Sequence, residues 1–336
     1  MGSVGAALSA IAAAVLAALL LLAASPAAGL EIIGAKGARG LAPENTLDGF
    51  AAALGVGVDR IQIDVVSSRD GVLVAHEGPR LNPDIARRRA TRQWLTAPTP
   101  LLKDYAYQDL WQFDVGRLEP TSRLARLYPD QEPAEGVSIP SLAEVFNLVR
   151  RAHAPEVRFM IEPRLTPRER ALTPNPRAFA ELLAREIGAL RLAPRVIVAS
   201  LDWTVPRVLQ TALPGIEVAL MTSEQPFLNT LERGRAGPSP WLAGFDADDF
   251  PTVPAMVMAA GAQAWAPNAL DASDAAVRNA KALGLKVFVW TVNDPQAMER
   301  FFDLGIDGIV TDYPDRLRKV LQKRGHALPR RHAVKP

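Results

Sequence analysis

KVFVWTVNDPQAMERFFDLGIDGIVTD, residues 286–312, decides the expected fold because it predicts two short strands joined by one helix. The runs at 286–292 and 307–312 contain Val and Ile in the proportion typical of strands that are buried on both faces. The stretch between them, 294–305, has a helical pattern. Two buried strands connected by a helix predict a βαβ unit with parallel strands.

The same alternation of strand and helix continues along the chain. The strand-like runs fall at 31–35, 60–67, 157–163, 195–200, 216–222, 262–267, 286–292 and 307–312. A further run, 72–76, is joined to 60–67 by a tight turn and predicts a hairpin. About eight strand–helix units in 336 residues favour an α/β fold of the closed (β/α)8 TIM-barrel type over an open doubly wound sheet. No Gly-x-Gly-x-x-Gly motif follows the first strand, so a dinucleotide site has little support.

Residues 79–140 interrupt this rhythm with a long stretch that is rich in Pro, Arg and Asp. A loop of that length is usually a functional insertion or a cap. In a barrel it would emerge beside the strand ends, at the face where barrel enzymes keep their sites. We therefore expect a barrel over residues 29–322 with an insertion after its early strands.

The N-terminal segment predicts export. Residues 6–24 carry no charge, and a helix of that length can just span a bilayer. The small residues that follow suit signal-peptidase cleavage, so residues 1–28 are predicted to be a signal peptide, with an uncleaved anchor as the alternative. We expect a periplasmic or secreted protein with no stable membrane span after cleavage. The chain has no cysteine, which excludes disulfides and cysteine nucleophiles.

The charge of the chain gives little information about partners. The formal net charge is only +2, and we expect no nucleic-acid partner because no strong field attracts one. Residues 323–336 form a basic tail, which we interpret as a solvated helix end and a frayed terminus. A patch for lipid or another polyanion is the alternative.

Several longer motifs, in this order along the chain, resemble the glycerophosphodiester phosphodiesterase family. They are GARGLAPENTLDGF (37–50), IQIDVVSSRDGVLVAHEGPRLNPD (61–84), IPSLAEVF (139–146), FMIEPRL (159–165) and VFVWTVNDPQAMERFFDLGIDGIVTDYPDRL (287–317). The resemblance implies a TIM barrel with an insertion after its early strands. It also implies hydrolysis of glycerophosphodiesters, such as glycerophosphocholine, to glycerol 3-phosphate and an alcohol, with Ca²⁺ or Mg²⁺ as cofactor.

The resemblance further implies site residues, which can be carried over one position at a time. In the family two histidines transfer protons, an arginine binds the phosphate and three acidic side chains hold the metal ion. The first histidine falls on Ala35, which cannot move a proton. The arginine beside it falls on Lys36, which keeps the charge but loses the bidentate fork. The second histidine falls on Glu77 when the flanks of that motif are aligned.

The metal ligands implied by the resemblance fall on Gln62, Asp64 and Glu162. A spacing of two along a strand places the first two on one face, pointing at one site. Gln62 offers an amide oxygen but no charge. Two interpretations stay open: the carboxylates bind Ca²⁺ or Mg²⁺ with help from Gln62, or Lys36 and Arg164 neutralise them in a metal-free ion-pair cluster.

The remaining candidates are a base and a set of substrate-binding groups. Glu77 is a candidate general base, because burial can raise the pKa of a carboxyl group. His76 lies one residue early and points to the opposite face of an extended strand, so we expect a wall histidine or one hydrogen-bonded near a loop. The candidate substrate-binding residues are Lys36, Arg39, Arg164 and Trp290, the last by cation–π contact with a choline-like group or, alternatively, as barrel packing.

These departures predict a protein of this family in which hydrolysis is impaired or absent, since the loss of acid–base catalysis costs orders of magnitude in rate. Two alternatives remain. One is an active phosphodiesterase that uses Glu77 and a divalent cation. The other is a non-catalytic periplasmic protein that binds a small phosphodiester.

Overall fold

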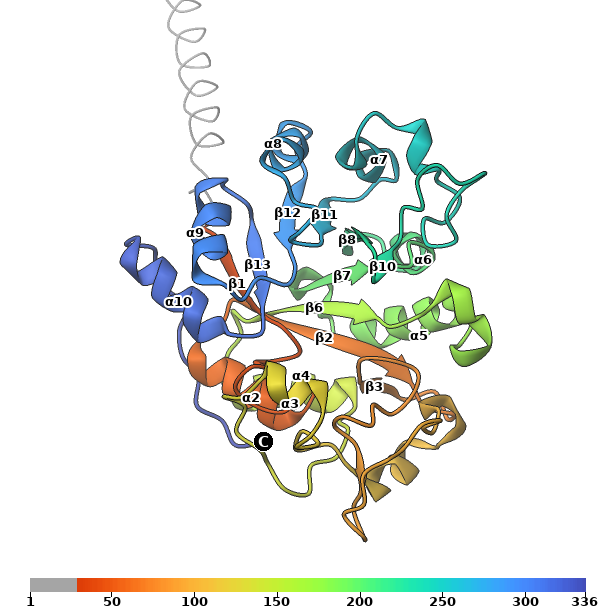
Figure 1. Cartoon of the computed structure of the whole chain (residues 1–336), viewed down its shortest axis with the longest axis vertical. Helices are drawn as coiled ribbons and strands as arrows, with labels where there is room; N and C mark the ends of the chain where they lie inside the picture. The colour runs from red at the N-terminus through yellow and green to blue at the C-terminus, as the bar shows by residue number, and fades with distance from the viewer. Residues whose placement is uncertain (1–28) are drawn as a thin grey trace, which may run out of the picture.

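The structure, a computed structural model, describes residues 29–336, and the expected signal peptide lies outside them. Eight parallel strands form a closed barrel, since the sheet order β1-β13-β12-β11-β8-β7-β6-β2 is completed by pairing of β1 with β2 (Figure 1). The strands are β1 (Glu31–Gly34), β2 (Arg60–Ser67), β6 (Arg158–Pro163), β7 (Val196–Ser200), β8 (Glu217–Thr222), β11 (Ala264–Pro267), β12 (Lys286–Val289) and β13 (Gly308–Thr311). The predicted (β/α)8 barrel is confirmed.

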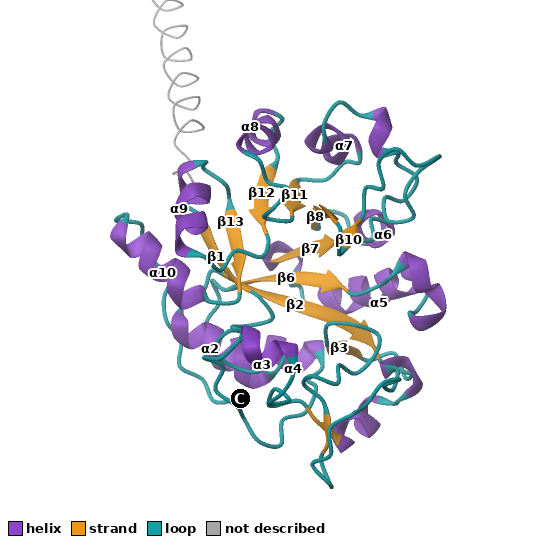
Figure 2. Ribbon diagram, in the orientation of Figure 1, coloured by secondary structure: helices purple, strands orange, loops and turns teal. Residues whose placement is uncertain are grey.

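Helices follow the strands and lie around the outside of the sheet (Figure 2). They are α2 (Leu47–Val56), α4 (Leu142–Arg151), α5 (Pro176–Ala189), α6 (Thr204–Ala212), α7 (Val253–Ala259), α8 (Asp274–Ala282), α9 (Pro295–Asp303) and α10 (Pro314–Lys323). Their starts follow ordinary capping chemistry. At α9, the Asp294 carboxylate accepts a hydrogen bond from the Ala297 backbone N–H, and Pro295 fills the first helical position.

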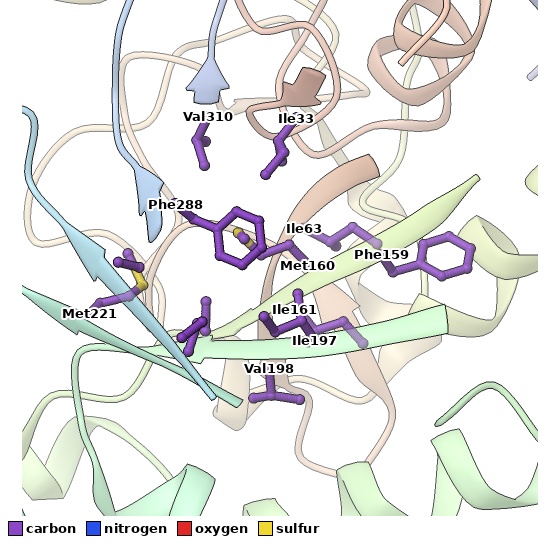
Figure 3. Packing of buried hydrophobic residues seen from close by; sticks show 14 of the residues in the cluster. Ile33, Ile63, Phe159, Met160, Ile161, Ile197, Val198, Met221, Phe288 and Val310 are labelled. Carbon is purple, nitrogen blue, oxygen red and sulfur yellow. The ribbon is translucent and has the colours of Figure 1, made fainter. Parts of the chain in front are cut away.

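The strands form the core because their side chains alternate between the barrel interior and the helix layer. All eight positions of β2 are buried, as expected for a strand covered on both faces. Figure 3 shows apolar side chains from seven of the strands meeting in this core. The labelled residues are Ile33, Ile63, Phe159, Met160, Ile161, Ile197, Val198, Met221, Phe288 and Val310.

The segment between β2 and α4 forms the predicted hairpin and insertion. Strand β3 (Leu73–Ala75) pairs antiparallel with β2, which confirms the hairpin. The insertion has its own apolar cluster, which includes Leu102, Leu110 and Phe113, beside the end of β2 (Figure 1). Its short elements are β4 (Arg87–Arg88), β5 (Phe113–Asp114), α3 (Arg123–Leu127) and the 3-10 helices η1 (Leu102–Asp104) and η2 (Tyr107–Gln112). The insertion therefore packs as a small satellite of the barrel.

The loops on the other side of the barrel contain the remaining short elements. These are the hairpin of β9 (Glu224–Gln225) and β10 (Leu228–Asn229), and the 3-10 helices η3 (Pro167–Leu172), η4 (Ala193–Arg195) and η5 (Ala247–Asp249). None of the helices within residues 29–336 is both long and apolar enough to cross a membrane.

The expectation of a frayed C-terminal tail is wrong. The buried His332 donates its backbone N–H to the Leu54 carbonyl at 2.8 Å, and its Nε2 lies 2.7 Å from Glu156 Oε1. Arg318 Nη1 donates to the Pro329 carbonyl at 2.8 Å. The tail therefore returns along the barrel and ends beside α2 and α4 (Figure 1). Its basic composition concealed these backbone contacts.

Candidate active site

A cavity of about 240 Å³ opens at the C-terminal ends of the barrel strands. Lining residues come in pairs two positions apart on neighbouring strands, for example Met160 with Glu162 on β6. This spacing agrees with the period of a strand. The cavity brings together all the predicted site residues, namely Lys36, Arg39, Gln62, Asp64, Glu77, Glu162, Arg164 and Trp290.

The turn after β1 supplies the first part of the wall. Ala35 is buried and presents a methyl group to the cavity. Lys36 has a φ of 51°, in the left-handed region that few non-glycine residues adopt. Two contacts hold this conformation: its backbone N–H donates to Gln62 Oε1 at 2.7 Å, and its carbonyl accepts from the Asn45 N–H at 3.0 Å.

The Lys36 ammonium lies among three carboxylates from three segments of the chain. Its Nζ is 2.8 Å from Glu77 Oε1, 3.4 Å from Asp64 Oδ2 and 3.5 Å from Glu44 Oε1. Burial and nearby Arg39 oppose this charge, but the three carboxylates outweigh them and raise the lysine pKa. Lys36 is therefore a cation at neutral pH, ion-paired with all three carboxylates.

Gln62 fills the space between two of the predicted metal ligands. Its Nε2 donates to Asp64 Oδ1 at 2.9 Å and to Glu162 Oε2 at 3.1 Å. The Lys36 backbone N–H can donate only to an oxygen, so the amide orientation follows from the hydrogen-bond network. We expected the amide oxygen of Gln62 to be available to a metal ion, but it accepts from the Lys36 backbone N–H instead. The amide nitrogen faces the carboxylates.

Arg164 closes the other side of this group. Its Nη1 pairs with Glu162 Oε1, and its Nε donates to the Glu77 carbonyl at 2.6 Å. Burial raises the pKa of Glu162 to about 6, although Arg164 acts in the opposite direction. We call this set of residues the Lys36 cluster. Its members are Lys36, Glu44, Gln62, Asp64, Glu77, Glu162 and Arg164.

The Lys36 cluster does not fit a divalent cation as it stands. Ca²⁺ and Mg²⁺ need several oxygens with free lone pairs that converge on one point. Here the carboxylate oxygens face ammonium, guanidinium and amide donors instead. Within residues 29–336, no group of three or more His, Cys, Asp or Glu side chains is arranged to hold a metal ion. Of the two interpretations left open by the sequence, the geometry favours the ion-pair cluster.

Glu77 lines the cavity, and His76 does not. The Lys36 ammonium is the main cause that holds the pKa of Glu77 far below its usual range. The His76 ring is buried, with Nδ1 2.9 Å from the Gly78 carbonyl oxygen, as expected for a histidine hydrogen-bonded near a loop. Burial lowers its pKa. Both shifts lower the affinity of the side chain for a proton, which makes each a weaker general base.

A second polar group, the Asp312 network, consists of Arg39, Tyr128, Asn293 and Asp312. It touches the Lys36 cluster where Arg39 Nη1 lies 3.5 Å from Glu44 Oε2. The Arg39 fork donates to Asp312 Oδ1 at 3.0 Å and to Oδ2 at 3.2 Å. Oδ2 also accepts from Asn293 Nδ2 at 2.7 Å and from the Tyr128 hydroxyl at 3.2 Å. The structure thus engages Arg39, a predicted phosphate ligand, in an internal ion pair.

The sequence analysis missed Tyr128 and Asn45 as partners of residues that line the cavity. Tyr128 follows α3 in the insertion, and its ring lies under the Arg39 guanidinium, 4.8 Å from ring centroid to Cζ. Asn45 donates from Nδ2 to Asp64 Oδ2 at 3.1 Å. For Asn45 the available signal was the Pro-Glu-Asn-Thr motif at 43–46, which precedes α2.

The tryptophans near the strand ends differ in their positions. Trp290 lines the cavity, and its indole Nε1 donates to the Ala266 carbonyl at 2.8 Å. Trp265 is 2% exposed, donates to Thr222 Oγ1 at 2.9 Å and does not line the cavity. Trp290 is therefore the one of the two that a ligand in this cavity could touch.

The fold and the site define a class of protein: a (β/α)8 barrel with a charged pocket at the C-terminal face, where barrel enzymes bind their substrates. The sequence model of the Glycerophosphoryl diester phosphodiesterase family matches residues 36–316. The chain belongs to this family.

Individual relatives agree with the family assignment. A glycerophosphodiester phosphodiesterase from Bacillus altitudinis is 27% identical over 296 residues, which cover 87% of this chain and 98% of the relative. A crystal structure from Silicibacter pomeroyi, assigned to the glycerophosphoryl diester phosphodiesterases, superposes with a TM-score of 0.77 and 30% identity, covering 89% of this chain and 95% of that one. An Oleispira antarctica phosphodiesterase, solved with the product sn-glycerol-3-phosphate, shares the fold at a TM-score of 0.58 and 19% identity, with 86% and 96% coverage.

Proposed function

We propose that this chain is a member of the family in which hydrolysis of glycerophosphodiesters is lost or strongly impaired. One observation carries the proposal: no imidazole lines the cavity within the described chain. The resemblance to the family implies proton carriers at the positions of Ala35 and Glu77, which agrees with the proposal. Hydrolysis of a phosphodiester needs a base that activates the nucleophile and an acid that protonates the departing alkoxide.

Glu77 is a poor replacement for the missing base. Its carboxylate is ion-paired with Lys36 at 2.8 Å, and its lowered pKa means that it has little affinity for a proton. A general base is efficient only when its pKa lies near the operating pH. The cations in the cavity hold their protons tightly and are poor acids for the leaving group. Glu162, with a pKa of about 6, is the cavity group best able to carry a proton, but its two carboxyl oxygens face Arg164 and Gln62.

An active phosphodiesterase that uses Glu77 and Ca²⁺ or Mg²⁺ is the enzymatic alternative. For such an enzyme, the Lys36 ammonium would have to leave the carboxylates and the Gln62 amide would have to rotate. The alternative therefore requires a rearrangement of several buried contacts before any cation can enter.

A non-catalytic phosphodiester-binding protein is the second candidate, and one observation favours it. Arg164 lines the cavity with a side chain that is 28% exposed, so its guanidinium can still reach an anion. Lys36 and Arg39 would add positive charge behind it, and Trp290 would contact a choline-like group. In this role the protein holds a small phosphodiester without cleaving it.

An assay with the purified protein and glycerophosphocholine tests these candidates. Release of glycerol 3-phosphate is measured with excess Ca²⁺, with excess Mg²⁺ and with chelator, and ligand binding is measured by calorimetry. We expect no turnover above the uncatalysed rate. Turnover that Glu77→Gln abolishes, while the exposed control Glu224→Gln retains it, would establish the enzymatic alternative. Saturable binding without turnover would establish the binding protein.

We also propose that the protein is exported to the periplasm or secreted. The support is the uncharged segment 6–24 followed by small residues. N-terminal sequencing of the protein recovered from a periplasmic or culture fraction tests this proposal. A mature N-terminus near residue 29 is the expected result, and an intact N-terminus in the membrane fraction would contradict it.

A further inference from the structure

In the Lys36 cluster, carboxylate oxygens surround the lysine ammonium in the way that they surround a bound metal ion in other proteins. Its ammonium is taken up by oxygens from the loop before α2, from β2 and from the chain after β3. The lysine side chain is 9% exposed, and those of Glu44 and Asp64 are 2% and 1% exposed. Oxygen ligands from separate segments that converge on one buried positive charge are what a hard metal ion requires.

Lys36 and Gln62 act together in this arrangement. The Gln62 oxygen holds the Lys36 backbone in its left-handed conformation, from which the side chain reaches the carboxylates. The same amide donates from its nitrogen to Asp64 and Glu162, the two remaining acidic ligand positions. A glutamate at position 62 could accept from Lys36 but could not donate to its neighbours, and would add a charge.

The balance of charge in the cluster leaves room for more positive charge. Four carboxyl groups, of Glu44, Asp64, Glu77 and Glu162, face the cations of Lys36 and Arg164. Arg39, whose fork pairs with Asp312, adds one longer contact of 3.5 Å from Nη1 to Glu44 Oε2. Loss of the Lys36 charge would leave Arg164 and this shared guanidinium to face the four carboxyl groups. Burying carboxylates without counter-charges costs free energy of folding, and a bound divalent cation is one way to neutralise their charge.

We propose that the Lys36 ammonium, with the Gln62 amide, is a built-in cation that replaces a divalent metal ion, so that the pocket is independent of metals. Removal of that ammonium turns the same carboxylates into a calcium site. The inference rests on the ion-pair geometry and goes beyond the proposed loss of hydrolysis, since it concerns cation binding in the absence of substrate.

The test compares thermal unfolding and calorimetric titration with CaCl2 for the unaltered protein and three variants. For the unaltered protein, we expect no binding heat and no difference in Tm between chelator and 10 mM Ca²⁺. This concentration is roughly tenfold above the dissociation constants of weak calcium sites. For Lys36→Met, we expect a lower Tm in chelator and a rise of roughly 3 °C or more with Ca²⁺. Lys36→Met with Gln62→Glu should bind Ca²⁺ about tenfold more tightly than Lys36→Met alone, because affinity follows ligand charge.

Lys36→Arg is the matched control, because it keeps the cation and should show no calcium-dependent rise in Tm. If Lys36→Met does not fold in chelator, Lys36→Gln replaces it, since its neutral amide can still donate to a carboxylate. Folding of either variant only in the presence of Ca²⁺ supports the proposal.

Three results would overturn the proposal. One is calcium binding by the unaltered protein that Asp64→Asn abolishes. Another is a folded Lys36→Met variant whose Tm does not respond to Ca²⁺, and the third is failure of both neutral variants to fold with or without Ca²⁺. None of these readouts involves phosphodiester cleavage, so the failure of this inference is distinguishable from the failure of the proposed function.

Discussion

The Asp312 network and the Lys36 cluster are neighbouring groups at the same barrel mouth, and they differ in charge balance. In the Asp312 network one carboxylate faces one guanidinium, and a tyrosine and an asparagine satisfy what remains. In the Lys36 cluster four carboxyl groups face two cations of their own, and Arg39 adds one contact of 3.5 Å to Glu44. Burial raises the pKa values of Glu44 and Glu162. Apart from the shared Arg39 contact the first group is electrostatically closed, whereas the second retains unbalanced charge.

This difference separates the Asp312 network, which stabilises the fold, from the Lys36 cluster, where the proposed function places the former catalytic groups. Asp312 and Asn293 lie in the motif that most resembles the family, and both are tied into the backbone, since Asn293 Oδ1 accepts from the Asp312 N–H at 2.9 Å. Lys36, Gln62 and Glu77, the positions that the proposed function treats as altered, all lie in the unbalanced group. On that proposal, the departures from the family fall in the Lys36 cluster and spare the Asp312 network.

The largest effect is expected for Asp312→Asn. The Asp312 side chain is 2% exposed, and its loss of charge leaves Arg39 buried without its principal partner. Breaking a buried ion pair costs about 3–5 kcal/mol in free energy of unfolding. Urea denaturation at pH 7 measures this loss. A cost below about 1 kcal/mol would show that the Asp312 network is not the closed structural pair described above.

The next effect is a pH dependence caused by Glu162. Its folded pKa of about 6 lies above the ordinary value of 4.5, so the folded state binds the proton more tightly than the unfolded state does. Stability therefore falls as pH rises from 4.5 to 6, by about 2 kcal/mol for this shift. Glu162→Gln should remove this slope.

The measurement is the free energy of unfolding of both proteins by urea at several pH values between 4.5 and 7.5. The difference between the two is what matters, because loss of the pair with Arg164 adds an offset that does not vary with pH in this range. A parallel pair of curves would mean that the Lys36 cluster is as well balanced as the Asp312 network. Glu44, whose pKa burial also raises, should show the same sign as Glu162.

A smaller effect is expected for Tyr128→Phe, which removes one hydrogen bond to Asp312 and keeps the ring under Arg39. The net contribution of such a bond is about 1 kcal/mol. Urea denaturation of the variant alone and combined with Asp312→Asn measures the coupling. Fully additive losses would show that Tyr128 does not act through the Asp312 network.

The smallest effect is expected for Arg278→Ala, a control outside both groups. Arg278 Nη1 lies 3.9 Å from Asp274 Oδ2, and the two side chains are 67% and 50% exposed. An exposed pair of this kind contributes at most about 0.5 kcal/mol, and salt screens it. A larger loss in urea denaturation would mean that surface charges, and not only the two buried groups, determine stability.

The sequence was sufficient to predict the barrel, because Val-rich and Ile-rich runs separated by helical runs have few alternative architectures. It also predicted that Gln62 and Asp64 face one site, since spacing of two along a strand fixes the face. These features depend on local periodicity. The hairpin of β2 and β3 depends on a local turn and was equally accessible.

The details that depend on long-range contacts could not be predicted. Nothing in the local pattern indicates that Tyr128 reaches Asp312 across the insertion, or that His332 docks between α2 and α4. The partners of Lys36 come from three distant segments, so its role as a counter-ion depends on the folded geometry. Long-range pairing of this kind is specified by the assembled barrel and not by neighbours in sequence.

The most direct test of the account is a comparison of phosphodiesterase activity between the unaltered chain and a variant that restores the family's side chains at four positions. The changes are Ala35→His, Lys36→Arg, Gln62→Glu and Glu77→His. With glycerophosphocholine and Ca²⁺, the account predicts no release of glycerol 3-phosphate by the unaltered chain and calcium-dependent release by the variant. Equal release by both proteins would contradict it, because the substituted mouth would then be catalytically competent without these side chains.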